Sequence, residues 1–174
     1  ITQTLLKYAE LQMAAEAVFS GENPKRIDDL PLSEIHNNSV MTDPRNLGLI
    51  SGNYRSSKFT ETEAARFNTH WELVEQISNT STGFSGSLFR CVSDDPLTGA
   101  KAGELVMSFR STEFLDDAVR DNQATNTLEI KDLGWAFGQI ADMERWYAKL
   151  SGEGGPLAGG QAFSVTGYSL GGHL

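Results

Sequence analysis

The sequence predicts one mixed α/β domain across its 174 residues, a length typical of a single domain with a core of its own. Three observations favour this fold class. Apolar residues recur at helical spacing in both halves of the chain, short runs of alternating apolar residues separate these segments, and the last run leads directly into a glycine-rich turn. A strand, a long helix and a second strand in succession are typical of parallel strand pairing.

The first predicted element is a helix near the N-terminus. Apolar residues from Leu5 to Val18 recur at helical spacing, and Gly21 can end the helix. Residues 22–58 are rich in Pro, Asn, Asp, Ser and Gly and predict a long irregular segment. Such a segment is either a functional element, which is a lid or a binding loop, or a surface loop without a function.

A capping box predicts the second helix. Thr60 is its N-cap, Glu63 follows three positions later, and the helical run continues from Ala64 to Ile77. These elements make residues 1–80 a helical and irregular N-terminal part of the domain.

The sheet is expected to lie within residues 81–174. Two β runs, Phe84–Val92 and Glu104–Phe109, flank a turn-rich segment and predict an antiparallel hairpin. Apolar residues at helical spacing then predict a crossover helix over Leu133–Leu150, followed by glycine-rich residues and a last strand at Phe163–Val165.

Directly after this strand the chain reads Gly-Tyr-Ser-Leu-Gly-Gly over residues 167–172, a G-x-S-x-G nucleophile elbow. In such an elbow a tight strand-to-helix turn holds the serine hydroxyl clear of its neighbours, and the glycines permit the strained backbone. Motif and context predict Ser169 as a nucleophile. The alternative is a glycine-rich turn that carries an ordinary surface serine.

Charge and composition restrict the classes of partner. The chain has 14 Lys and Arg against 23 Asp and Glu, a formal net charge of −9. An acidic surface without a basic cluster argues against nucleic acid and against adhesion to anionic membranes. No run approaches the ~20 apolar residues of a membrane-spanning helix, and Cys91 is the single cysteine, so the chain can form no internal disulfide.

No metal and no cofactor is expected. The three His and one Cys have no H-x-x-x-H or C-x-x-C spacing. The acidic pairs at 94–95 and 116–117 are better explained as solvated turns than as Ca²⁺ ligands. The glycine-rich residues 152–160 lack the Gly-Lys-Ser/Thr ending of a phosphate-binding loop.

A second motif makes the elbow more specific. The strand before the crossover helix ends in Phe-Arg, and Ser111 and Thr112 follow it in the loop; Ser169 follows Thr112 by 57 residues (169 − 112 = 57). The two motifs in this order resemble the class 3 lipase family, whose loop reads Phe-Arg-Gly-Thr or Phe-Arg-Gly-Ser and whose elbow reads Gly-His-Ser-Leu-Gly-Gly. Ser111 and Tyr168 depart from that pattern. The resemblance covers residues 84–174.

The resemblance implies a partial α/β-hydrolase fold and a lipase-like carboxylic ester hydrolase acting on acyl (glycero)lipid esters. Ser169 would attack the ester carbonyl and form an acyl-enzyme. The backbone N–H groups of Leu170 and Thr112, with the Thr112 hydroxyl, would form the oxyanion hole. The resemblance also favours a secreted protein.

Three further residues would support this site. Gly167 and Gly171 flank the nucleophile, and Asp121 stands where the family often has an acidic residue that anchors the oxyanion loop. Asp116 or Asp117 could take the same part, and the alternative for all three acids is a solvated loop.

A histidine base and a carboxylate must activate the serine, and α/β-hydrolases supply them after the elbow. Only five residues follow Ser169 (174 − 169 = 5). His173 would point away from the hydroxyl, and His36 and His70 precede the hairpin. We therefore expect an N-terminal half of a hydrolase, inactive alone, which self-associates through strand edges and apolar surface that the missing half would cover.

Two alternatives stay open at the level of sequence. A phospholipase, feruloyl-type esterase, thioesterase or peptidase uses the same elbow, because fold does not fix function. A non-catalytic binding domain could also retain a relict elbow.

Overall fold

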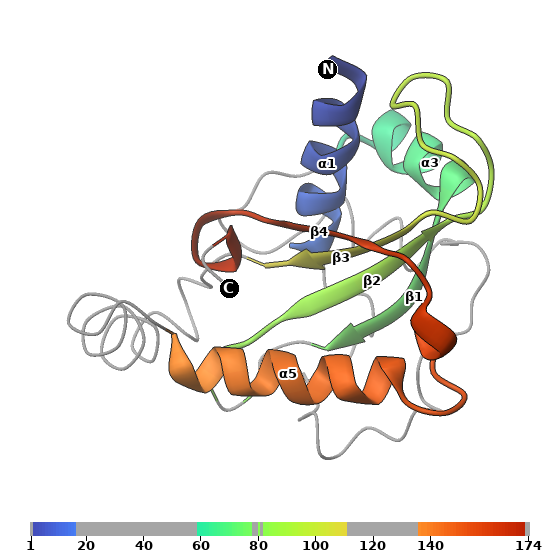
Figure 1. The fold of residues 1–174 in the computed structure, drawn as a ribbon. Coiled ribbons are helices and arrows are strands. Elements are labelled where there is room, and N and C mark those ends of the chain that lie inside the picture. The colour runs from blue at the N-terminus through green and yellow to red at the C-terminus, as the bar shows by residue number, and fades with distance from the viewer. Residues whose placement is uncertain (1, 17–58, 78–79, 81, 111–135, 173–174) are drawn as a thin grey trace.

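The computed structural model describes residues 2–16, 59–77, 80, 82–110 and 136–172. These residues form a four-stranded mixed sheet with helices on both faces (Figure 1). The predicted mixed α/β class is thereby confirmed. The predicted irregular segment at 22–58 lies outside the described residues.

The strands follow one another across the sheet in the order β1-β2-β3-β4. β1 (Trp71–Ile77), β2 (Gly86–Cys91) and β3 (Leu105–Phe109) are antiparallel neighbours, so the predicted hairpin is present. β4 (Ser164–Gly167) pairs parallel to β3, because the helix α5 (Phe137–Ser151) returns the chain to the same end of the sheet. The crossover helix and the last strand are therefore also confirmed.

The second predicted helix is correct at its start and wrong at its end. Thr60 caps α3 (Glu61–His70): its hydroxyl accepts from the Glu63 amide at 3.3 Å, while the Glu63 carboxylate accepts from the Thr60 amide at 2.9 Å. The helix ends at His70 instead of Ile77, and the sheet begins at the next residue rather than after residue 80. Pairing with β2 decides the conformation of this segment, whose apolar spacing suits either a helix or a strand.

A β-bulge at Val74 divides β1 between the two faces of the sheet. Its register with β2 shifts between Leu73 and Glu75. Trp71 and Leu73 belong to the core on the α3 side, whereas Ile77 belongs to the core on the α5 side. The extra residue reverses the alternation and turns the Glu75 side chain toward α5.

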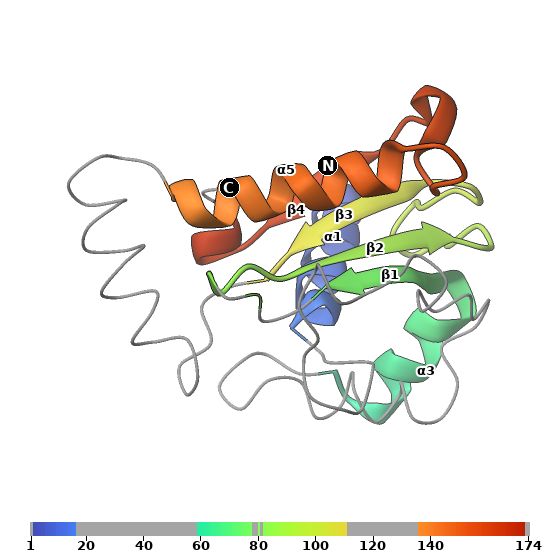
Figure 2. The same cartoon turned by 90° about the horizontal axis from the view of Figure 1, so that it is seen from below.

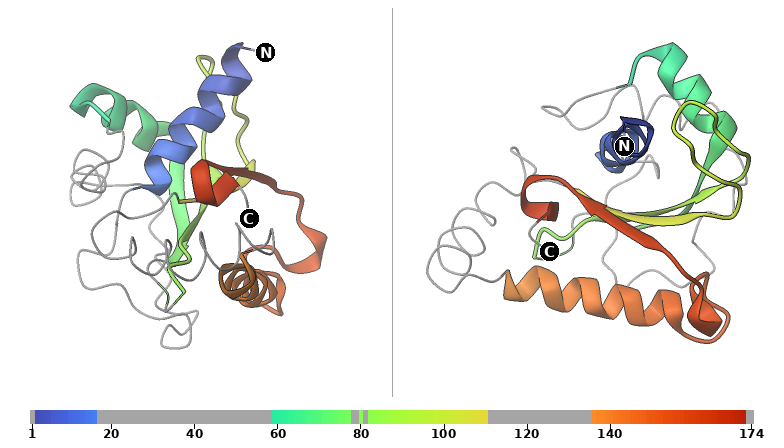
Figure 3. Two further views of the ribbon diagram at one scale, coloured as in Figure 1. Left: turned by 90° about the vertical axis from the view of Figure 1, so that its left-hand side faces the viewer. Right: turned by 45° about the horizontal axis from the view of Figure 1, so that its top comes forward.

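The helices enclose the sheet in three layers. α1 (Thr2–Ala15) and α3 lie on one face, and α5 lies on the other (Figures 2 and 3). On the first face, Phe67 stacks on Trp71 and meets Phe89 edge-on. On the second face, the ring of Trp146 packs against Phe84. Each face thus has its own buried aromatic core.

Within the described part of the chain, no helix has the length and apolar character needed to cross a membrane.

Candidate active site

The predicted strand-to-helix turn is present at the end of β4. The strand ends at Gly167, Tyr168 follows, and the short helix η5 (Ser169–Gly172) begins with the predicted nucleophile. Leu170, whose N–H is a predicted oxyanion donor, is the second residue of η5. Tyr168 is 63% exposed, so the side chain next to Ser169 in sequence faces solvent.

Two elbow glycines are required by close backbone contacts. A Cβ atom on Gly167 would overlap the carbonyl group of Gly171. A Cβ atom on Gly171 would lie 2.5 Å from the carbonyl oxygen of Phe109 and 2.6 Å from that of Arg110. Any side chain at either position would push η5 away from the strands beneath it.

The same contacts bring the two sequence motifs together. Phe109 and Gly167 are paired residues of β3 and β4, and η5 packs on the end of β3. Arg110 is only 4% exposed, and its amide donates a hydrogen bond to the Ser85 carbonyl at 3.1 Å. Phe109, the residue of the Phe-Arg-Ser-Thr motif that ends β3, therefore lies beside the elbow. The carboxyl ends of adjacent parallel strands are the usual place for a site in α/β proteins.

The remaining predicted residues of the oxyanion loop lie outside the described residues. They are Thr112, Asp121 and the alternatives Asp116 and Asp117. Two of the three histidines, His36 and His173, also lie outside them.

His70 is placed at the opposite edge of the sheet from the elbow. It directly precedes Trp71, which pairs with Cys91 near the start of β3, whereas Gly167 pairs with the end of β3. With ~3.3 Å per strand residue and ~4.8 Å between strands, the separation exceeds about 15 Å. A general base must lie within about 3 Å of its proton donor, so His70 does not activate Ser169.

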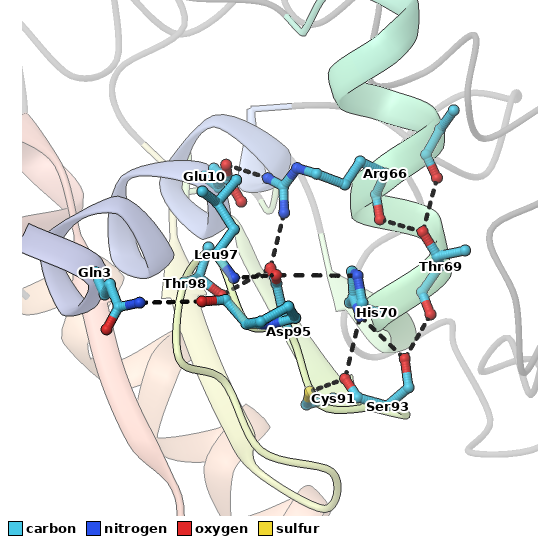
Figure 4. A network of polar contacts seen from close by, with 12 residues as sticks. Gln3, Glu10, Arg66, Thr69, His70, Cys91, Ser93, Asp95, Leu97 and Thr98 are labelled. Carbon is cyan, nitrogen blue, oxygen red and sulfur yellow. Dashed lines mark hydrogen bonds and ion pairs between the residues drawn. The ribbon is translucent and has the colours of Figure 1, made fainter.

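A second polar cluster, missed by sequence reasoning, surrounds His70 (Figure 4). His70 Nδ1 lies 3.0 Å from Ser93 Oγ, and His70 Nε2 lies 3.9 Å from Asp95 Oδ1. The residue types are those of a Ser-His-Asp triad, but the protons are arranged differently. Ser93 Oγ donates its single proton to the Thr69 carbonyl at 2.8 Å, so Nδ1 must donate to Ser93. An imidazole that donates to the serine cannot be its base.

This cluster instead joins α1, α3 and the turn between β2 and β3. Arg66 forms ion pairs with Glu10 of α1 and, at 2.7 Å, with Asp95. Burial raises the pKa of Asp95, but hydrogen bonds from the Thr98 hydroxyl and the Leu97 amide outweigh it and hold the pKa below its usual range. Burial raises the pKa of Glu10 despite its contact with Arg66.

A third polar group lies under α5. The indole N–H of Trp146 donates to Glu75 Oε1 at 2.9 Å, while Oε2 has no hydrogen-bond partner among the described residues. Burial raises the pKa of Glu75, which is 2% exposed. Asp142, one turn before Trp146, accepts from the Thr82 hydroxyl at 2.5 Å and pairs with Arg145. Nowhere in the described ranges do three His, Cys, Asp or Glu residues gather as metal ligands would.

Comparison with known proteins gives no match. The chain matches no family model, no curated protein and no solved structure.

Proposed function

We propose that this chain carries the nucleophile half of a lipase-like serine ester hydrolase with a partial α/β-hydrolase fold. The observation that supports the proposal most is the fit of the elbow: Gly167 and Gly171 contact each other and the end of β3 too closely for any side chain. A surface serine in an ordinary glycine-rich turn does not need this packing. The position of the turn at the carboxyl ends of two parallel strands adds to the support.

The reaction follows from the residue types. Ser169 Oγ attacks the carbonyl carbon of an ester while its proton passes to a base, and the oxyanion accepts hydrogen bonds from the N–H groups of Leu170 and Thr112. Collapse of the tetrahedral intermediate expels the alcohol, which takes the proton, and leaves Ser169 acylated. Water then attacks the acyl carbonyl carbon while the base takes its proton, and the bond to Oγ breaks, which releases the carboxylic acid and returns the proton to Ser169.

The base and the carboxylate come from outside the described residues. His70 is the only histidine within them, and it lies at the other edge of the sheet. On this proposal the described residues include the nucleophile and one oxyanion donor, and the chain has no hydrolytic activity without the residues that supply the base.

The substrate class is an acyl (glycero)lipid ester. The proposal takes this class from the paired Phe-Arg-Ser-Thr and Gly-Tyr-Ser-Leu-Gly motifs and their resemblance to class 3 lipases. Hydrolysis of long-chain triacylglycerol emulsions in preference to short-chain soluble esters would support a lipase. Preference for phospholipids, feruloyl esters or thioesters would assign another substrate to the same nucleophile.

The proposal is tested by fluorophosphonate labelling of the native gene product in its source cells and medium. The labelled band is sized, and the modified peptide is sequenced. Ser169→Ala should abolish labelling. Ser93→Ala is the matched control, because Ser93 also lies beside a histidine and an aspartate, and it should label like the unchanged protein.

The size of the band then tests the half-domain. Label on Ser169 in a band well above 19.0 kDa supports a base supplied by a longer polypeptide. Label in a band of 19.0 kDa means that the base lies within this chain or a second copy, which overturns the half-domain. Absence of label overturns the hydrolase and favours a binding domain with a relict elbow.

A further inference from the structure

Two hydrogen bonds fasten α1 to the strands that carry the candidate site. The side-chain amide of Gln12 donates to Thr166 Oγ1 at 2.6 Å, across 154 positions of sequence. The hydroxyl of Ser108, which is fully buried, donates to the carbonyl of Leu11 at 3.0 Å. Two adjacent residues of α1, Leu11 and Gln12, are thus hydrogen-bonded to Ser108 of β3 and Thr166 of β4 respectively.

The two strand residues are themselves partners. Ser108 and Thr166 pair across β3 and β4, and each is followed directly by a residue of the tight elbow contact, Phe109 and Gly167 respectively. A shift of α1 would therefore act on both sides of that contact at once.

The other end of α1 is fastened away from the site. Lys7 forms an ion pair with Glu104 at 2.8 Å, just before β3 begins, and the Gln3 amide donates to the Pro96 carbonyl at 3.0 Å. The contacts from Lys7 to Gln12 therefore follow β3 from its start to its end. Only the C-terminal part of α1 reaches the residues next to the elbow.

We propose that Gln12 is a positioning residue for Ser169: through Thr166 it sets the place of the elbow relative to the end of β3. This role rests on the proposed function. On the proposed function such control is needed because the two oxyanion donors come from different parts of the sequence: Leu170 belongs to η5, and Thr112 follows the last residue of β3 by three positions. A donor acts only when it lies 2.7–3.1 Å from the oxyanion, so a small relative shift of the two segments weakens the site.

The test compares two glutamines on one helix. Gln12→Ala removes the contact next to the elbow, and Gln3→Ala removes a contact of the same chemical type at the far end of α1. Both are introduced into the native gene product, and the rate of fluorophosphonate reaction at Ser169, kcat, KM and the melting temperature are measured. Gln12→Ala should slow phosphonylation about tenfold with KM unchanged. This lies between the roughly fivefold effect of one hydrogen bond and the ~10²-fold effect of a 1 Å displacement.

A second pair of variants separates positioning from folding. Thr166→Val removes the acceptor with little change of volume and should slow Ser169 like Gln12→Ala, whereas Thr166→Ser keeps a hydroxyl and should restore the rate. The double variant Gln12→Ala with Thr166→Val should be no slower than either single variant, because both remove one interaction.

The outcomes distinguish this inference from the proposed function. Equal rates for Gln12→Ala and Gln3→Ala, or failure of Thr166→Ser to restore the rate, overturn the positioning role while the hydrolase stands. If the unchanged protein does not label, the hydrolase falls, and hydrogen exchange of the amides at 167–172 decides the inference. Faster exchange in Gln12→Ala than in Gln3→Ala supports control of the elbow by α1, and equal exchange overturns it.

Discussion

On the proposed function, Gly171→Ala tests whether the elbow must lie against β3 for Ser169 to react. The added Cβ would lie 2.5 Å from the Phe109 carbonyl oxygen, whereas ordinary contacts begin at about 3.5 Å. Relief therefore needs a displacement of about 1 Å between η5 and β3. The backbone of residue 171 fixes the position of the added Cβ, and the atoms that it meets are backbone carbonyl atoms of Phe109 and Arg110, so no side chain can rotate away.

The displacement should lower both the stability of the domain and the rate at which Ser169 is labelled. Overpacking of this kind typically lowers the free energy of unfolding by about 1–3 kcal/mol. That corresponds to a fall in melting temperature of about 2–12 °C for a domain of this size. A misplacement of ~1 Å can lower the rate of a positioned reaction about 10²-fold, so the rate of fluorophosphonate labelling should fall by about that factor.

Gly172→Ala is the matched control for this variant. Its Cβ would lie 3.2 Å from the Gly167 carbonyl oxygen, so the backbone must give by only a few tenths of an ångström. Its labelling rate should stay within about tenfold of the unchanged protein. Labelling and melting that are equal in the two alanine variants would refute the reasoning, since only one of them has the severe clash.

Three further predictions concern the rest of the domain. Because burial raises the pKa of Glu75, the folded chain loses stability as the pH rises through that pKa. Glu75→Gln, which keeps an acceptor for Trp146, should melt higher than the unchanged protein at pH 8 and equally below about pH 4.5, the usual pKa of a glutamate. Burial raises the pKa of the Cys91 thiol to about 11, so iodoacetamide should alkylate it only in denaturant, and rapid native alkylation would contradict this. Val165 is 56% exposed on β4, one of the two edge strands of the described sheet, and should promote self-association, which Val165→Lys should reduce in sedimentation experiments.

Local signals in the sequence predicted the elements that local physics determines. The Thr60 and Glu63 pattern satisfies helix N–H groups within four residues, so it could be recognised without the fold. The contact between Gly167 and Gly171 is also local, whereas the contacts of Gly171 with the Phe109 and Arg110 carbonyls join segments that are distant in sequence. The hairpin and crossover helix followed from long periodic runs.

The errors and omissions arise where distant residues decide the structure. Trp71–Ile77 was predicted as helix because its apolar spacing is ambiguous, and only pairing with β2 makes it a strand. The Gln12 contact with Thr166 crosses 154 positions, and neither residue belongs to a recognisable motif. The contact of Arg66 with Glu10 likewise joins two helices that no sequence pattern connects.

On the proposal for Gln12, the N-terminal part of the chain has a role that its sequence did not indicate. The two motifs that predict the candidate site begin at Phe109. The helix that is hydrogen-bonded to their strands, α1, ends far earlier in the sequence, at Ala15. The elbow glycines allow η5 to approach β3 closely. They do not determine where η5 lies, because residues without side chains allow several positions. The Gln12 and Ser108 hydrogen bonds restrict that freedom from the face of the sheet that α1 covers. A truncation that removes α1 should therefore impair the Ser169 site even though it leaves both motifs intact.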